Sequence, residues 1–183
     1  MEEYSEAQSY LISAAEELEE FLLSGANTWQ VAGSNNFPPL TPGNVLFAMK
    51  QLAGFNDAAG EVDRVKKALD HINHIRIKWE SNWKKRVKQE IPQRLRLWSN
   101  YLDDYFQSQN QEQREFCWSV RWRVILALLM DEIEDLDQEL LVQLKVLDEV
   151  LQARIAPGPF IWDERLKAVF DPDHFWFLYL KIS

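Results

Sequence analysis

Apolar side chains recur every three or four residues along most of the chain, which is the spacing that one face of an α-helix requires. Residues 5–23 show this spacing, with glutamates on the opposite face. Residues 24–43 have no such periodicity and are rich in Gly, Asn, Ser and Pro. Thr41 followed by Pro42 matches an N-cap and the first position of a helix, which predicts a short helix to about Leu52.

Two long helical tracts are predicted in the middle of the chain. The first covers about 58–108 and contains Pro92, which lacks a backbone N–H and predicts a kink there. The second covers 112–154, either as one helix of about 65 Å or as two helices with a break near 135–137. This second tract carries a near-heptad row of apolar residues, here named the leucine seam. The seam consists of Leu126, Leu129, Ile133, Leu136, Leu140, Leu144, Leu147 and Leu151.

A Pro-rich segment at 156–159 separates these tracts from the C-terminal stretch. Asp171 followed by Pro172 predicts another N-cap and a final, aromatic helix. A strand is the alternative for 175–182, because that run is short and apolar. The predicted fold class is therefore all-α: a single domain, 1–183, built as an antiparallel helical bundle of about five to six helices with one long irregular loop.

The composition agrees with a folded protein. The 183 residues are 46% hydrophobic and 13% aromatic, which gives enough side-chain area to offset the entropy lost on ordering the chain. The longest aliphatic run, from Val124 to Met130, is too short to span a bilayer, and the acidic start is unlike a signal peptide. Cys117 stands alone, which excludes an intrachain disulfide and a cysteine-based zinc site. We therefore expect a protein of the reducing cytoplasm.

The eight tryptophans are expected to act mainly as packing residues, because each fills a large volume and needs one partner for its indole N–H. Trp79 and Trp83 lie on the apolar stripe of the first tract and not on its basic face. Trp118 and Trp122 are four residues apart and lead into the leucine seam, which is a spacing typical of core positions.

Charge is distributed unevenly along this acidic chain, whose formal net charge is −9. Residues 64–99 hold eleven Lys or Arg and three Asp or Glu. The rest of the chain holds nine Lys or Arg and twenty-six Asp or Glu. One face of a helical projection of this segment carries the candidate anion- or partner-binding residues, here named the basic band. They are Lys67, His71, His74, Lys78, Lys85 and Lys88. The basic band either binds an external anion such as nucleic acid or pairs with the protein's own carboxylates at 131–139, and we favour the second interpretation.

Motifs that would indicate catalysis are weak. The two histidines of the basic band lie three residues apart, but neither belongs to the Glu-x-x-His pair of a di-iron bundle, and the spacing offers no third ligand, so no metal site is predicted. Glu16-x-x-Glu19 and Glu132-x-x-Asp135 resemble the carboxylate pairs of all-α magnesium-dependent nucleotide pyrophosphohydrolases. That resemblance covers eight residues and implies a magnesium-dependent hydrolase as one alternative.

The function that these features predict is binding: a cytoplasmic, non-enzymatic helical protein that acts as a protein–protein interaction or scaffold module, with no cofactor. A homodimer through the 126–151 leucine seam is also predicted, because the seam is long enough to outreach its intrachain partners. Nucleic-acid or anion binding through the helix at 64–99 is the other alternative. The 24–43 loop is either functional or a crossover held to the bundle by Trp29 and Phe37, and we favour the crossover.

Overall fold

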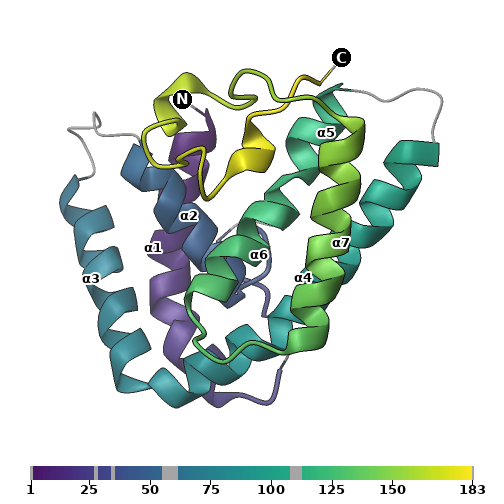
Figure 1. The fold of residues 1–183 in the computed structure, drawn as a ribbon. Helices are drawn as coiled ribbons and strands as arrows, with labels where there is room; N and C mark the ends of the chain where they lie inside the picture. Colours follow the sequence, from purple (N-terminus) through teal and green to yellow (C-terminus); the bar gives the residue numbers. More distant parts are fainter. Residues whose placement is uncertain (1, 27–28, 34–35, 55–61, 108–112, 183) are drawn as a thin grey trace. The chain divides into compact units, whose positions relative to one another are not determined.

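The computed structural model describes residues 2–26, 29–33, 36–54, 62–107 and 113–182 (Figure 1). Within these ranges the protein is all-α and contains no strand, as predicted, and no helix is long and apolar enough to cross a membrane. The helices are α1 (Glu2–Leu23), α2 (Pro42–Gly54), α3 (Val62–Lys78), α4 (Glu80–Gln107), α5 (Gln113–Ser119), α6 (Arg121–Asp131), α7 (Gln138–Arg154) and the 3₁₀ helices η1 (Glu164–Leu166) and η2 (Trp176–Leu178).

Contacts between residues divide the chain into two compact units, residues 1–90 (unit 1) and residues 91–183 (unit 2), and each is described by itself. The boundary falls inside α4, directly before Pro92. The helix continues through Pro92 without a break. A kink at this proline and a single domain over the whole chain both stay predictions.

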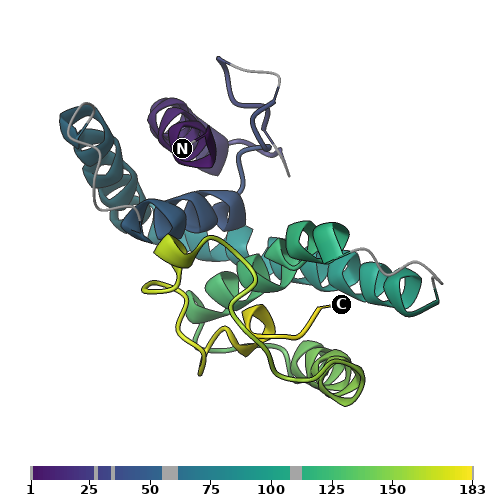
Figure 2. The same ribbon diagram turned by 90° about the horizontal axis from the view of Figure 1, so that it is seen from above.

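In unit 1, α2 and α3 both pack against α1 (Figures 1 and 2). Figure 1 shows α2 running opposite to α1, with α3 running in the same sense as α1. The side chains that α1 and α3 bury recur at helical spacing, so the hydrophobic pattern of the sequence placed this core correctly. Fully buried side chains of this unit include Leu11, Leu18, Phe21, Leu22, Leu40, Ile72 and Ile75.

The irregular segment between α1 and α2 is held to α1. The Glu17 carboxylate accepts hydrogen bonds from the indole N–H of Trp29 and from the backbone N–H of Ala32, the latter at 2.8 Å. The rings of Phe37 and Tyr10 meet edge to face, with their centroids 5.9 Å apart. The described part of this loop is therefore the crossover that the sequence favoured, held by Trp29 and Phe37.

The start of α2 is completed by a residue far along the chain. The Thr41 hydroxyl accepts a hydrogen bond from the Asn44 backbone N–H (3.2 Å), which confirms the predicted N-cap. That hydroxyl also donates to one oxygen of Glu90, and the Gly43 N–H donates to the other, each at 2.8 Å. A buried carboxylate thus lies at the N-terminus of α2, where free N–H groups and the helix dipole favour negative charge.

The tract predicted over 58–108 contains two helices, α3 and α4, separated at Trp79. The Trp79 indole N–H donates to Glu19 on α1 (2.8 Å), and the Asn82 amide in the first turn of α4 donates to the Leu22 carbonyl (3.2 Å). These contacts hold the interruption at the C-terminal end of α1. The helical hydrogen bonds continue through it, because the Trp79 N–H donates to the Ile75 carbonyl (2.8 Å) and the Trp83 N–H to the Trp79 carbonyl (2.9 Å). Both predicted ends of the tract lie outside the described residues.

Unit 2 contains the rest of α4, the helices α5 to α7 and the C-terminal segment. α5 and α6 are separated only by Val120, and helical hydrogen bonds continue through it. α6 ends at Asp131 and α7 begins at Gln138, where the Asp137 side chain accepts a hydrogen bond from the Glu139 N–H (2.8 Å). The second predicted tract is therefore divided close to the break that the sequence offered as one of its two alternatives.

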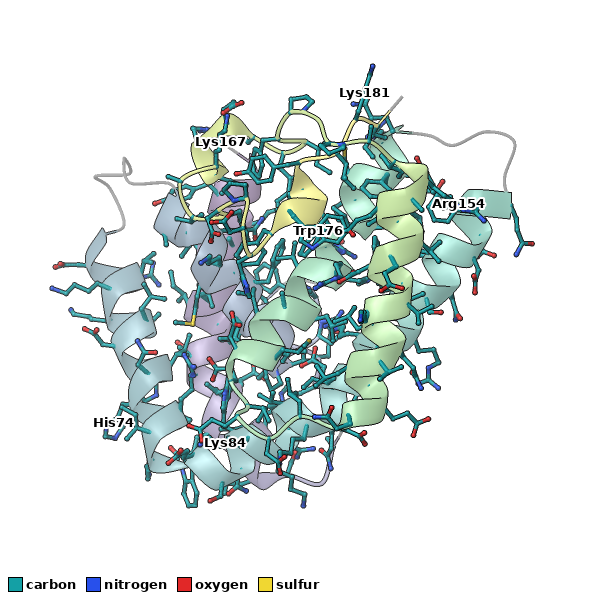
Figure 3. All side chains as sticks on the ribbon, in the orientation of Figure 1. His74, Lys84, Arg154, Lys167, Trp176 and Lys181 are labelled. Atoms are coloured by element: carbon teal, nitrogen blue, oxygen red, sulfur yellow. The ribbon has the colours of Figure 1, made fainter. Side chains whose placement is uncertain are left out.

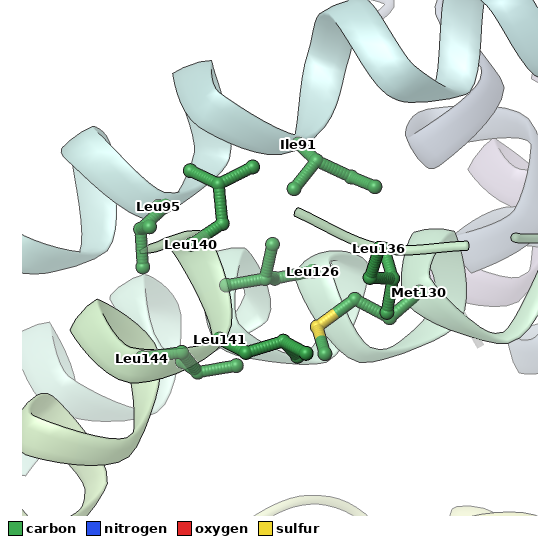
Figure 4. A pocket seen from close by; sticks show the side chains of 8 residues that line it. All are labelled: Ile91, Leu95, Leu126, Met130, Leu136, Leu140, Leu141 and Leu144. Atoms are coloured by element: carbon green, nitrogen blue, oxygen red, sulfur yellow. The ribbon is translucent and has the colours of Figure 1, made fainter. Parts of the chain in front are cut away.

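The leucine seam faces the interior of unit 2. Four of its members lie around one small apolar space between α4, α6 and α7 (Figure 4). The side chains around this space are Ile91, Leu95, Leu126, Met130, Leu136, Leu140, Leu141 and Leu144. Only about 10 Å³ is left open, which is close to the room for one water, and the lining offers that water no polar partner. Five members of the seam are buried and three are half-buried, so most of it is packed within unit 2; the half-buried members are Leu136, Leu140 and Leu147.

The predicted final helix is absent from the described residues, and so is its strand alternative. The Asp171 carboxylate does cap a turn, accepting a hydrogen bond from the His174 N–H (2.9 Å), but only the short η2 follows. The backbone of this segment pairs with the Pro-rich segment instead, where the Gly158 N–H donates to the Tyr179 carbonyl (2.8 Å). Gly158 allows this approach because a Cβ there would lie 2.7 Å from the Leu180 backbone.

Two tryptophans are placed as the sequence predicted, and one is not. Trp83 is buried, and Trp79 is half-buried with its indole N–H satisfied. Trp118, by contrast, is 61% exposed, so the core position inferred from its spacing is wrong. Its ring is stacked by the Arg121 guanidinium, whose central carbon lies 3.8 Å from the ring centroid, which is a cation–π contact at the surface.

Candidate interaction surfaces

All six residues of the basic band are exposed. Lys67, His71, His74 and Lys78 follow one another at helical spacing on α3, and Figure 3 shows His74 projecting away from the helix. Lys85 and Lys88 lie beyond the Trp79 interruption, on α4. The helical projection assumed one continuous face. In the structure the basic band is instead formed by two helices. Among the described residues, Lys67, Lys85 and Lys88 make no ion pair.

One lysine of the band is bound by α1. The Lys78 ammonium lies 2.7 Å from a carboxylate oxygen of Glu19. Hydrogen bonds from Lys78 and then from Trp79 lower the pKa of Glu19, against a small opposing effect of desolvation. The band is thus neutralised in part from within unit 1, by a residue that the sequence analysis did not consider as its partner.

The carboxylates at 131–139 belong to unit 2, and several of them have local partners, Glu139 among them because it accepts a hydrogen bond from Gln143. Asp131 lies 3.0 Å from the His174 ring nitrogen, and Asp137 caps α7. The proposed pairing of these carboxylates with the basic band crosses the two units, and it stays a prediction.

At least one basic residue of 64–99, Arg86, stabilises the fold and is not available to a partner. The Arg86 guanidinium is buried and donates to the backbone carbonyls of Phe21, Ser24 and Ala26 at the C-terminal end of α1. A cation at this end compensates both the free carbonyls and the helix dipole. A charge count along the sequence cannot separate such an arginine from a surface lysine.

The next question is whether the described residues could hold a metal ion. Across the described ranges, no group of three or more His, Cys, Asp or Glu side chains lies close enough together to hold a metal ion. The two histidines of the basic band are exposed, and Glu19 of the first carboxylate pair is engaged by Lys78 and Trp79. The hydrolase alternative stays a prediction.

The outer side of α7 carries a row of exposed valines, here named the valine face. Val142, Val146 and Val150 are 61, 52 and 36% exposed and follow one another at intervals of four residues. Side chains four apart lie on the same side of a helix. The row ends in a polar residue at each end of the helix, Gln138 and Arg154, which are both exposed.

The inner side of α7 is packed. Leu144 and Leu151 are buried, and the Asp148 carboxylate takes two hydrogen bonds from the Arg123 guanidinium of α6, at 3.0 and 2.8 Å. That guanidinium also lies over the Phe177 ring, 4.3 Å from its centroid. α7 is thus fixed to unit 2 by one side and presents apolar side chains on the other.

The flanks of the valine face are polar. On one flank, the Lys145 ammonium lies 3.8 Å from a Glu149 carboxylate oxygen. An open hollow of about 370 Å³ lies further round the helix and reaches its packed side, because it is lined by Leu141, Leu144, Lys145, Asp148, Glu149 and Gln152. On the other flank, Arg154 lies over the Phe106 ring at 4.6 Å, close to the end of α4 (Figure 3). An apolar row with charged borders is the composition expected of a surface that another helix covers.

The sequence analysis missed the valine face, although the signal was present. The valines occupy positions 142, 146 and 150, in the same stretch as the leucine seam. The seam accounts for the helical periodicity by itself, so the second apolar row does not stand out in the sequence. A helix with two apolar rows on different sides is the pattern that reveals such a surface.

Comparison of the chain with protein-family models, with curated proteins and with solved structures found no match. The functional conclusion therefore depends on the two surfaces themselves, the valine face and the basic band.

Proposed function

We propose that this protein is a non-enzymatic helical module that binds another protein chain through the valine face of α7. The observation that carries the proposal is the contrast between the two sides of one helix, with Leu144 and Leu151 packed inside and three valines exposed outside. The proposed compartment is the cytoplasm, because Cys117 is a free thiol.

The valine row places apolar side chains in contact with water, which is unfavourable. Single exposed apolar residues are ordinary on protein surfaces. Three in one row on a helix form a contiguous apolar strip, and a helix that is apolar on both sides is normally covered on both. A partner helix laid along the row would bury these side chains and meet the charged flanks at its borders.

The test is site-specific photo-crosslinking in cells that express the chain. A benzophenone amino acid is placed at Val146 in one version and at Gln152 in another, because both positions are exposed on α7 and only the first belongs to the valine row. We expect irradiation to join position 146, and not 152, to one discrete protein species. Absence of any crosslinked species at 146, or equal crosslinking at both positions, would contradict the proposal.

Anion binding through the basic band is the second candidate, and one observation favours it. Lys67, Lys85 and Lys88 are exposed and make no ion pair among the described residues, as a phosphate-binding surface requires. The overall net charge of −9 opposes it, because a negative chain repels a polyanion at long range. Protein binding through the valine face therefore remains the leading candidate.

The basic band is tested by reversing three of its charges. The variant carries Lys67→Glu, Lys78→Glu and Lys85→Glu, and the probe is a labelled single-stranded oligonucleotide titrated at several salt concentrations. If the band binds anions, the wild type binds with a steep salt dependence and the variant does not bind. Equal affinity in both proteins, or no binding by the wild type at low salt, would remove this candidate.

A further inference from the structure

The valine face has internal features that identify its occupant. The exposed row Gln138, Val142, Val146, Val150 and Arg154 is nearly symmetric about Val146, with one valine on each side and one polar residue at each end. A row of this kind matches itself when it is turned end to end. Helices commonly pack by fitting such rows, spaced by four residues, into the grooves of a partner.

We propose that a second copy of this chain covers the valine face, with the two α7 helices antiparallel and the two-fold axis passing through Val146. This inference rests on the proposed function and specifies its partner. In this arrangement Val142 of each chain packs against Val150 of the other, and the two Val146 side chains meet at the axis. The interface is isologous, because the same patch is used by both copies.

Charge complementarity supports the antiparallel direction. A two-fold axis of this kind places the same flank of both helices on the same side, so Lys145 of one chain lies close to Glu149 of the other, twice. On the opposite flank, Glu139 in the first turn of one helix comes level with Arg154 in the last turn of the other, also twice. The two helix dipoles are then opposed as well, which favours this direction over a parallel one.

The homodimer predicted from the sequence is thus retained, but its surface is changed. The leucine seam closes the core of unit 2, and the valine row on the other side of α7 is the surface open to a second chain.

The size of the surface predicts a weak dimer. α7 has 17 residues, so two crossed copies meet over at most ~25 Å of helix. Stable interfaces bury about 800 Å² on each partner, and one helix face with three valines supplies only part of that area. We therefore expect a dissociation constant in the micromolar range and a monomer–dimer equilibrium that depends on protein concentration.

The first experiment is sedimentation velocity across the micromolar range for the full chain. We expect the wild type to shift from monomer to dimer and Val146→Glu to raise the dissociation constant about tenfold or more, because a symmetric interface contains the substitution twice. Gln152→Glu, which adds the same charge on the same helix, is the matched control and should dimerise like the wild type. A far-ultraviolet dichroism spectrum checks that each variant remains helical.

The second experiment determines the direction of the helices by disulfide formation in a Cys117→Ser background. Val146→Cys should form a disulfide-linked dimer by itself, because residue 146 meets its own copy at the axis. Val142→Cys and Val150→Cys should crosslink when mixed and much less when each is alone. A parallel pair would give the reverse pattern, with efficient crosslinking of each single variant.

The third experiment exchanges the charges of one flank. Lys145→Glu and Glu149→Lys should each weaken dimerisation, and the double variant should restore it, because both intermolecular pairs are then re-formed with reversed signs. A wild type that stays monomeric at high micromolar concentration would overturn the second copy as occupant. The proposed function would still stand if photo-crosslinking at 146 joined the chain to a different protein, so the two failures are distinguishable.

Discussion

The helices α1 and α7 each bury one apolar side, but they expose different kinds of residue on the other side. α1, in unit 1, buries Leu11, Leu18 and Phe21 and exposes Glu16 and Glu20 on its other side. α7, in unit 2, also buries one side but exposes valines on the other. The amphipathic pattern of α1 is explained by the chain's own fold up to its last residue, Leu23, which is 51% exposed. The pattern of α7 is only half explained, and the unexplained half indicates where a second molecule is needed.

The largest expected effect tests which side of α7 is core. Leu144→Glu places a carboxylate among the leucines of Figure 4 and should lower the free energy of unfolding by about 4 kcal/mol or more. Val142→Glu makes the same type of change on the outer side and should leave the stability of the monomer nearly unchanged. Urea unfolding followed by dichroism at low protein concentration measures both. Equal losses in the two variants would contradict the assigned orientation of α7.

The next effect compares two neighbouring carboxylates on α7. Asp148→Ala leaves the buried Arg123 guanidinium without its carboxylate and should cost about 3 kcal/mol. Glu149→Ala removes a carboxylate that pairs with exposed Lys145, and should cost at most about 1 kcal/mol. Denaturant midpoints of the two variants give the comparison. A cost at Glu149 as large as at Asp148 would place the buried side of α7 one residue further along.

A smaller effect is expected among the glutamates of α1. Glu17→Ala removes the acceptor of the Trp29 indole and the Ala32 N–H and should cost about 1–2 kcal/mol. Glu20→Ala, three residues away on the exposed side, is the control and should change stability little. Thermal unfolding of both variants is the measurement, and tryptophan fluorescence reports whether Trp29 has moved into water. A stable Glu17→Ala protein with unchanged fluorescence would show that the crossover does not depend on this carboxylate.

The smallest effect concerns pH and the Lys78 contact of α1. The pKa of Glu19 is lowered below its usual 4.5, so the stability it contributes is fully present above about pH 4.5 and is lost as pH falls through the folded-state pKa. Glu19→Gln lacks this contribution, and the difference in stability between wild type and variant should shrink between neutral pH and about pH 3. Urea unfolding at both pH values tests this, with Glu20→Gln as the matched control. A difference that stays constant with pH would contradict it.

Local chemistry and periodicity predicted much of this structure. The N-cap at Thr41 and the core face of α1 follow from residues adjacent in the sequence, so the sequence predicted them, whereas the break before α7 was one of two alternatives that the sequence left open. The contacts of Trp79 and Asn82 with α1 join residues sixty positions apart, and no local pattern encodes such contacts. The C-terminal segment illustrates the same limit, because its hydrogen bonds pair it with the Pro-rich segment around Gly158.

The candidate surfaces were predicted less well, for a related reason. The basic band was found as a run of charge, yet charge alone cannot tell a buried Arg86 that caps α1 from an exposed Lys85. The valine face was hidden by the stronger leucine seam in the same helix. In both cases the deciding quantity is which side of a helix its neighbours cover, and that quantity belongs to the tertiary fold.

The buried Glu90 has a consequence for the order in which unit 1 acquires its structure. Its carboxylate completes the start of α2 from 47 and 49 residues further along the chain. During synthesis, which proceeds from the N-terminus, α2 is made long before the residue that satisfies its first N–H groups. Unit 1 therefore reaches its final stability only once the chain has been extended through residue 90. A fragment that stops before this residue, at the end of α3 for example, would retain the sequence of α2 but lack the group that holds its first turn.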